Sequence, residues 1–303
     1  MDEIDLRIIL LLMNNSRLTY REISEYLNLS VNAVFKRVQS LIDYRIIEKF
    51  VTRIKPYAIN AIYTFIFGQS KSQDVNNKIF ELGEHDNTWQ IMLSSRNYMY
   101  IGAMLENIHQ LDEYASFVSQ TVEMLSPKIG FLSGVQYKSP VPYIIPKSGT
   151  MNFDKLDVEI IRSLHKDSRK PISEIADDIN STSNTIRRRL TRLVDEGVIE
   201  LSIDFNPQES NDIFALLQIS TNPMTDKIQL AKELNEKYDP HLFYCWTFSN
   251  LPNLIVSWVW VNSMKELTDL VENIKREKVE SILFDIMSNV YYFDTWKEKL
   301  LYK

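Results

Sequence analysis

Residues 16–41 read SRLTYREISEYLNLSVNAVFKRVQSL, and this stretch decides how the chain begins to fold. Thr19 and Glu22 have the spacing of a capping box, in which both side chains bond the backbone at a helix N-terminus. Ser30 can cap a second helix in the same manner. Apolar residues then recur at helical spacing, at Val34, Val38, Leu41 and Ile42. The stretch predicts two short helices joined by a tight turn.

The flanking residues complete a small domain. Ile4, Ile8 and Leu11 have helical spacing and predict a helix before the two just described. Ile46 and Ile47 lead into alternating residues that predict a two-stranded wing. Three short helices and a wing describe a winged helix-turn-helix. An ordinary three-helix bundle is the alternative.

The same unit occurs twice along the chain. Placing residue n over residue n+152 gives 16 identities in the 47 positions from 2 to 48, without a gap. This is an internal duplication. The proline-punctuated stretch SPVPYIIPKSG, residues 139–149, reads as the linker between the copies.

After each copy the periodicity changes to strand, helix, strand, strand, helix, strand. In the first repeat these elements are expected at 62–67, 74–84, 88–94, 98–105, 110–124 and 129–137, and residues 213–293 give the same order. This order is that of the ferredoxin-like split βαβ fold. The predicted class is α+β, with two winged helix-turn-helix domains alternating with two ferredoxin-like βαββαβ domains. The expected divisions are 1–55 and 153–207 for the winged helices, 56–138 and 208–303 for the βαββαβ domains, and 139–152 for the linker.

These motifs together resemble the Lrp/AsnC transcription regulators. DEIDLRIILLL and the quoted helix-turn-helix carry the resemblance in the first copy, and LDVEIIRSL, ISEIADDINSTSNTIRRRL and EGVIE carry it in the second. The resemblance implies DNA-binding regulators that dimerise through their sheets and often sense amino acids there. In that family the ligand site lies near glycine- and aspartate-bearing turns between the two central strands. The turns LSSRNYMYIG and TFSNLPNLIV lack that pattern, which puts an amino-acid effector in doubt.

Composition argues against several other classes. Cys245 is the only cysteine and the four histidines are scattered, so neither a disulfide nor a zinc cluster is expected. No phosphate loop, GxGxxG, HExxH or GxSxG motif occurs, which favours a protein that is not an enzyme and needs no cofactor. No apolar run approaches ~20 residues, and the acidic N-terminus is unlike a secretory signal. We therefore expect a cytoplasmic protein without a membrane segment.

The chain has a net charge of -6, yet residues 183–200, SNTIRRRLTRLVDEGVIE, concentrate arginine on one predicted helix. Its face opposite the apolar stripe predicts contacts to DNA bases, because Arg and Asn can form bidentate pairs in the major groove. The predicted base-reading residues are Asn184, Arg188 and Thr191, and the predicted phosphate or positioning residues are Arg187, Arg189 and Arg192. The first copy offers Asn32, Lys36, Arg37 and Gln39 on its helix, and Lys49, Arg53 and Lys55 on its wing. A solvated charged face is the alternative.

The βαββαβ halves lead to an expectation about packing, and two other functions remain as alternatives. Both faces of the strands LFYCWTF and NLIVSWVWV are apolar, so we expect the two sheets to pack together, within one chain or between two chains. A siroheme decarboxylase-like enzyme is the alternative function, because such enzymes resemble the same arrangement and His85 and His241 precede equivalent strands. An architectural module without a specific operator is the third possibility. Double-stranded DNA is the predicted partner, with a small-molecule effector left open.

Overall fold

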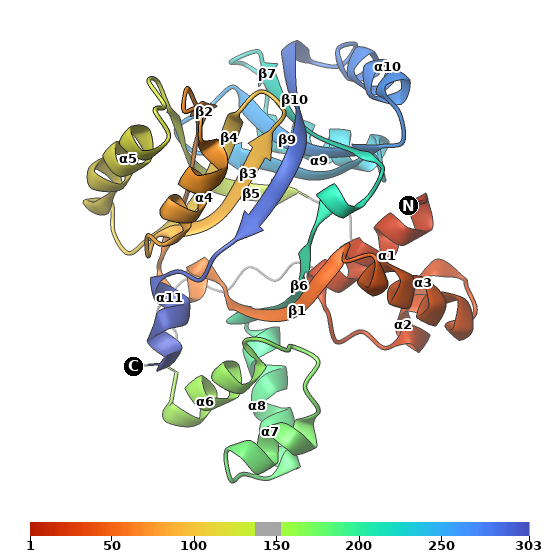
Figure 1. Cartoon of the computed structure of the whole chain (residues 1–303). Coiled ribbons are helices and arrows are strands. Elements are labelled where there is room, and N and C mark those ends of the chain that lie inside the picture. The colour runs from red at the N-terminus through yellow and green to blue at the C-terminus, as the bar shows by residue number, and fades with distance from the viewer. Residues whose placement is uncertain (137–152, 303) are drawn as a thin grey trace. The chain divides into compact units, whose positions relative to one another are not determined.

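The computed structural model describes residues 1–136 and 153–302, so the predicted linker lies outside the described residues (Figure 1). The chain divides into two compact units, and each gathers like parts of both repeats. Of the described residues, the winged-helix unit comprises Asp2–Ile62, 153–206 and 294–302. The sheet unit comprises Met1, 63–136 and Pro207–Phe293. The predicted α+β class is confirmed.

The winged-helix unit contains three helices from each repeat. They are α1 (Glu3–Asn14), α2 (Tyr20–Leu27) and α3 (Val31–Asp43), then α6 (Lys155–Leu164), α7 (Ile172–Asp178) and α8 (Ser183–Asp195). The capping box of Thr19 and Glu22 forms at α2, and Ser30 caps α3, as predicted. In the second repeat α7 lacks a side-chain cap because Pro171 stands at its N-cap position.

The turn before each third helix requires an unusual backbone conformation. Asn28 ends α2 with φ of 53°, and Asn180 stands at the equivalent place with φ of 50°. Asparagine tolerates this left-handed region better than most side chains do. The geometry of the turn thus accounts for one of the identities between the repeats.

The wings differ from the prediction. Each repeat contributes one strand, and β1 (Ile47–Ile54) pairs antiparallel with β6 (Ile199–Phe205) to form a single two-stranded sheet. The expectation of a two-stranded wing in each repeat was wrong, because the partner of each wing strand is the wing strand of the other repeat. The pairing buries apolar side chains of both, among them Ile54, Leu201 and Ile203.

Reciprocal contacts hold the two winged helices together beside this sheet. The hydroxyls of Ser16 and Ser168 lie 2.6 Å apart. Arg17 donates to the carbonyl oxygen of Ser168 over 2.8 Å, and Arg169 donates to that of Ser16 over 2.6 Å. The serine and the arginine are identical in the two repeats, and the arginine of each repeat bonds the serine carbonyl oxygen of the other. Such reciprocal contacts are those found at the two-fold axis of an isologous dimer.

The end of the chain returns to the winged-helix unit. After Asp294 the chain forms α11 (Trp296–Lys299) and the short helix η3 (Leu300–Tyr302), neither of which was predicted. Lys297 is fully buried there and donates to the carbonyl oxygen of Ile54 over 3.2 Å. A second short helix, η1 (Pro56–Ile59), follows β1.

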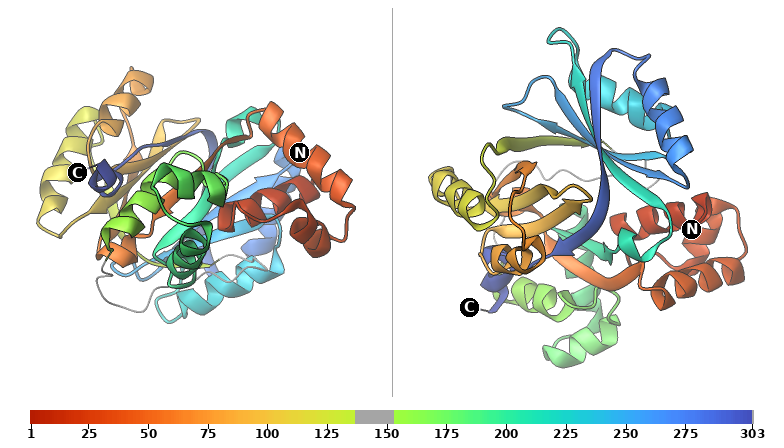
Figure 2. Two further views of the ribbon diagram at one scale, coloured as in Figure 1. Left: turned by 90° about the horizontal axis from the view of Figure 1, so that it is seen from below. Right: turned by 45° about the horizontal axis from the view of Figure 1, so that its top comes forward.

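In the sheet unit the predicted βαββαβ order is present twice. The first repeat has β2 (Ile62–Gln69), α4 (Val75–Gly83), β3 (Thr88–Ser94), β4 (Tyr98–Leu105), α5 (Gln110–Thr121) and β5 (Lys128–Gln136). After η2 (Pro207–Glu209), the second has β7 (Ile213–Thr221), α9 (Lys227–Lys237), β8 (Leu242–Phe248), β9 (Leu254–Val261), α10 (Met264–Ile274) and β10 (Val279–Tyr292). The eight strands close into one barrel in the order β10-β3-β4-β2-β5-β8-β9-β7. Figure 2 gives two further views of the strands and helices of both repeats.

The last strand of each repeat joins the two halves. β5 pairs with β2 of its own repeat and with β8 of the other. β10, the long blue strand in Figure 1, pairs with β7 along one part of its length and with β3 along another. The sequence predicted two sheets that pack together, and the edge-to-edge joining was not foreseen.

Apolar side chains of the two repeats also meet across the sheets. The rings of Phe65 and Trp246 stack at 5.0 Å, and the indole nitrogen of Trp258 lies 3.3 Å from the Met92 sulfur. The sheet faces predicted to need a cover are therefore covered within one chain. A bulge after Leu242 interrupts the regular alternation of faces along β8, so that Leu242 and Cys245 both pack on the helix-covered core.

Candidate nucleic-acid interface

The α8 helix has a buried stripe and an exposed polar face, as predicted. Ile186, Leu190 and Leu193 are buried in the core of the second winged helix. Asn184, Arg187, Arg188, Thr191 and Arg192 are exposed. Among the residues that the structure describes, Arg188 has no ion pair or hydrogen bond, so its guanidinium is available to a partner.

Two other arginines of α8 are held by acidic side chains. Arg189 pairs with Asp154 and, over 3.0 Å, with Asp157, whose side chain is 1% exposed. Arg192 lies 2.5 Å from Asp157 and is 42% exposed. The hydrogen bond with Asp154 raises the pKa of Arg189, and the same contact lowers the pKa of Asp154. These arginines join α8 to α6, so the basic face is smaller than the sequence suggests.

The first repeat has the same construction on α3. Arg37 bonds Asp2 and Asp5 over 2.8 Å and 2.7 Å, which joins α3 to α1. Three predicted reading residues, Asn32, Lys36 and Gln39, are exposed, and Gln39 donates to Asp43 over 3.0 Å. Lys36 occupies the position equivalent to Arg188. It too has no ion pair or hydrogen bond within residues 1–136 and 153–302.

The structure places the three wing cations differently from one another. Lys49 is exposed, with a side chain 60% accessible. Arg53 pairs with Asp204 of the opposite wing strand, and both side chains are 12% exposed. Lys55 is 7% exposed, and burial lowers the pKa of its amine. Because Arg53 is paired across the wing and Lys55 is buried, we leave both out of the proposed DNA surface.

Sequence reasoning missed the exposure of two apolar residues on α3. Val31 is 47% exposed and Phe35 is 45% exposed, although both types usually lie inside a protein. The signal was present in the repeat alignment, because Ser183 and Arg187 occupy the equivalent positions of α8. Arg187 is exposed on α8, and Phe35 at the same place on α3 is exposed as well.

The strand-joining turns of the sheet unit are bonded to the opposite repeat. The Ser95 amide donates to the Ile286 carbonyl oxygen in β10, and the Ser249 amide donates to that of Phe131 in β5, both over 2.9 Å. Arg96 adds an ion pair with Asp285 over 2.9 Å. These turns, where the family resemblance implied an effector site, thus hold the two halves of the barrel together.

The two histidines considered for a tetrapyrrole site have partners near helices of their own repeats. His85 lies 4.7 Å, ring to ring, from Phe117 of α5. His241 stacks on Trp260 at 5.9 Å and lies 3.6 Å from Glu266 of α10. No group of three or more His, Cys, Asp or Glu in the described part of the chain is placed to hold a metal ion.

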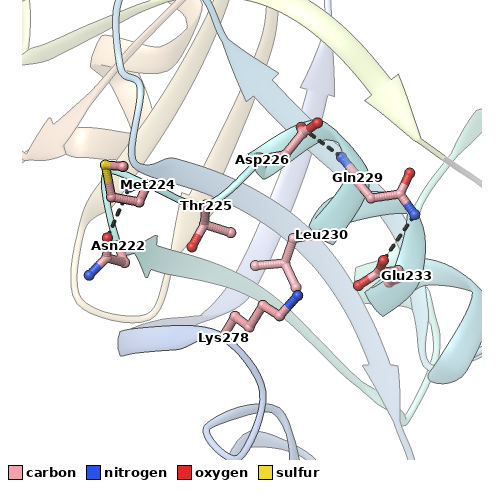
Figure 3. A pocket seen from close by; sticks show the side chains of 8 residues that line it. All are labelled: Asn222, Met224, Thr225, Asp226, Gln229, Leu230, Glu233 and Lys278. Atoms are coloured by element: carbon pink, nitrogen blue, oxygen red, sulfur yellow. Dashed lines mark hydrogen bonds between the residues drawn. The ribbon is translucent and has the colours of Figure 1, made fainter.

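A pocket of about 370 Å³ lies at the start of α9 (Figure 3). Its lining residues are Asn222, Met224, Thr225, Asp226, Gln229, Leu230, Glu233 and Lys278. The Asp226 carboxylate accepts from the backbone amides of Ile228 and Gln229, so it serves as the helix cap. The Gln229 side chain donates to Glu233 over 2.9 Å. Most of the polar groups of this pocket are thus used within the fold.

A family model of the winged helix-turn-helix DNA-binding domain matches residues 1–48 and 153–200. The model thus matches once in each repeat, over the three helices of each winged helix. The two matches contain α3 and α8, the helices that expose Lys36 and Arg188. Within residues 1–136 and 153–302, no helix is both long and apolar enough to cross a lipid bilayer.

Curated proteins that this chain resembles are transcription regulators by name. An uncharacterized HTH-type transcriptional regulator of Pyrococcus horikoshii is 36% identical over 92 residues, which are 30% of this chain and 58% of that protein. The HTH-type transcriptional regulator LrpA of the same organism is 26% identical over 132 residues, 43% of this chain and 89% of its own length. The resemblance to Lrp/AsnC regulators predicted from the sequence is confirmed.

A solved structure with a different title matches the fold over nearly the whole chain. The siroheme decarboxylase NirDL superimposes with a TM-score of 0.61, covering 99% of this chain and 98% of its own, at 10% sequence identity. At that identity the match shows the shared fold alone.

Proposed function

We propose that the chain is a sequence-specific regulator of transcription that places α3 and α8 in the major groove of double-stranded DNA. The observation that carries the proposal is the repeated pair of exposed side chains on these helices. Asn32 and Lys36 on α3 match Asn184 and Arg188 on α8 in position and chemistry. Asparagine and arginine pair with adenine and guanine edges, and a cation one turn from an amide suits a groove lined by phosphates.

The pairing of the two winged helices favours a single chain that contacts DNA with two domains, as a dimer of single-domain regulators would. β1 and β6 join the two domains, and Ser16, Arg17, Ser168 and Arg169 make reciprocal contacts between them. Two reading helices related in this manner address two half-sites of a duplex. The sheet unit supplies the second attachment between the repeats.

Fluorescence anisotropy on duplexes obtained by binding-site selection tests the proposal. Arg188→Ala and Lys36→Ala should each weaken binding to the preferred site by ~1–3 kcal/mol and relax base preference. Lys155→Ala is the matched control, because Lys155 is a cation of the same unit that lies 92% exposed on α6. This variant should bind DNA with the affinity of the wild type. Equal affinity of all three variants for the selected duplex would refute the assignment of the reading helices.

The full-length fold match favours one second candidate, an enzyme of the siroheme decarboxylase kind. His85 and His241 are its possible site residues, and their contacts with Phe117 and Glu266 place both near helices of their own repeats. An iron–tetrapyrrole titrated into the full chain gives a decisive readout. A shifted absorption band that His85→Ala and His241→Ala abolish would support the enzyme. An unchanged spectrum would leave the regulator as the function.

A further inference from the structure

The first two turns of α3 present an apolar edge beside the proposed DNA contacts. Val31 and Phe35 lie one turn apart on the same side of the helix, 47% and 45% exposed. Asn32 and Lys36 follow each of them directly and are also exposed. The α8 helix is polar at the same two places, where it carries Ser183 and Arg187.

Part of the Phe35 ring is used inside the domain. It meets the Tyr20 ring of α2 edge-on, with centroids 5.5 Å apart and planes at 73°. Almost half of the side chain remains open to solvent. This apolar surface lies beside an asparagine and a lysine. Its removal from water by a bound partner would lower the free energy of the complex.

The N-terminal residues of a recognition helix are those that contact base edges. In the major groove the apolar group is the 5-methyl of thymine, and phenylalanine is among the side chains that contact it. An arginine side chain, as α8 carries at the equivalent place, can bond guanine or a phosphate instead. The two helices of one chain thus present different chemistry to their half-sites.

We propose that Phe35, with Val31 beside it, reads thymine methyl groups, so that the chain prefers a non-palindromic DNA site. The half-site of α3 contains thymine where the half-site of α8 contains guanine or only a phosphate contact. This inference rests on the proposed function and names the partner of that same surface. Asn32 and Lys36 supply the contacts that both half-sites share.

Replacing thymine by deoxyuridine tests this, because it removes one methyl group and leaves the base pair intact. Binding-site selection with the full chain first defines the two half-sites, and selection with Phe35→Arg identifies the one that α3 reads. In that half-site, replacing a thymine that the selection requires by deoxyuridine should weaken DNA binding by the wild type about fourfold, which is the effect of one buried methyl group. Phe35→Ala should bind more weakly and be indifferent to the change.

Arg187→Ala is the matched control in the other helix. It should lose affinity while keeping the wild-type response to deoxyuridine in the α3 half-site. Phe35→Arg serves where Phe35→Ala fails to fold, because α8 already accommodates arginine at that position. It too should be indifferent to deoxyuridine.

The outcomes separate the two proposals. If the wild type selects no duplex, the proposed function fails and this inference fails with it. If it selects a duplex with two equal half-sites, or if deoxyuridine leaves wild-type affinity unchanged, only the reading by Phe35 is overturned. Equal deoxyuridine sensitivity of Phe35→Ala and the wild type would assign the ring to packing against Tyr20.

Discussion

Arg188 and Arg189 are neighbours on one helix and have opposite surroundings. Arg188 is exposed, whereas Arg189 is 22% exposed and bonds the carboxylates of Asp154, which caps α6, and of Asp157 within it. One of these carboxylates, that of Asp157, is 1% exposed and takes part in the N-terminal capping box of its own helix. A buried carboxylate needs its partners far more than an exposed one does.

We therefore expect Arg189→Ala to reduce the free energy of unfolding by ~1–3 kcal/mol, with Arg192 remaining beside Asp157. Arg188→Ala should change it by no more than ~0.5 kcal/mol, as surface substitutions usually do. Urea unfolding followed by circular dichroism measures both. Arg37→Ala should cost less in the first domain, because its partners Asp2 and Asp5 are 51% and 18% exposed. Equal stability of the Arg188 and Arg189 variants would contradict this division of roles.

At the scale of elements, the C-terminal segment from Asp294 to Tyr302 is held by contacts that the sequence did not reveal. His165, at the end of α6, lies 3.3 Å from Asp294 through Nε2 and 3.4 Å from the Thr52 carbonyl through Nδ1. The hydrogen bond with Asp294 raises the pKa of His165, and the same contact lowers the pKa of Asp294. Glu298 and Lys297 also lie in this cluster.

The pH dependence follows from these directions. The lowered pKa of Asp294 contributes stability above about pH 4 that is lost as pH falls through its folded value. The raised pKa of His165 contributes stability that is complete below about pH 6.5 and lost as pH rises through its folded value. Both contributions are present between those limits, so the segment should be held more weakly at pH 8.5 than at pH 6.

The Asp294 side chain is 60% exposed, so solvent screening should limit the effect to about 1 kcal/mol or less. The measurement is the difference in unfolding free energy between the wild type and His165→Asn at several pH values. The difference should shrink from pH 6 to pH 8.5. Asp294→Asn is the matched control and should show the same trend, whereas a difference that is constant with pH would refute the ion pair.

At the scale of the whole molecule, the two repeats make close contacts with each other inside one chain. The Tyr100 hydroxyl of β4 accepts from Gln218 of β7 over 2.8 Å and donates to Asp285 of β10 over 3.2 Å. All three side chains are buried. Gly130 in β5 approaches Phe248 in β8 so closely that a Cβ atom would lie 2.5 Å from the ring.

Gly130→Ala should therefore cost ~1–3 kcal/mol of unfolding free energy, the usual effect of overpacking a core. Gly68→Ala is the matched control, because its Cβ would meet the flexible Met124 side chain at 2.9 Å, which can move aside. Gly130→Ala as stable as Gly68→Ala would show that β5 and β8 are not joined as described.

Light scattering of the wild type should give a mass near 35.6 kDa, because the two repeats are joined within one chain.

The sequence by itself determined the duplication, the three helices of each winged helix, the βαββαβ order and the exposed face of α8. These depend on local patterns: caps such as Thr19 with Glu22, apolar periodicity, and turn residues such as Asn28. Each acts over a few residues along the chain, so the pattern alone contains the information.

Only the tertiary structure decided which cations remain exposed and how the repeats join. Arg53, Lys55 and Arg189 look like Lys49 and Arg188 in the sequence, because charge pattern does not show that Asp204 or Asp157 lies opposite. The single-strand wings and the shared strands β5 and β10 likewise depend on partners about 100 or more residues away. Which strand edge or carboxylate a group meets is fixed by packing of the whole chain, and local propensity carries no record of it.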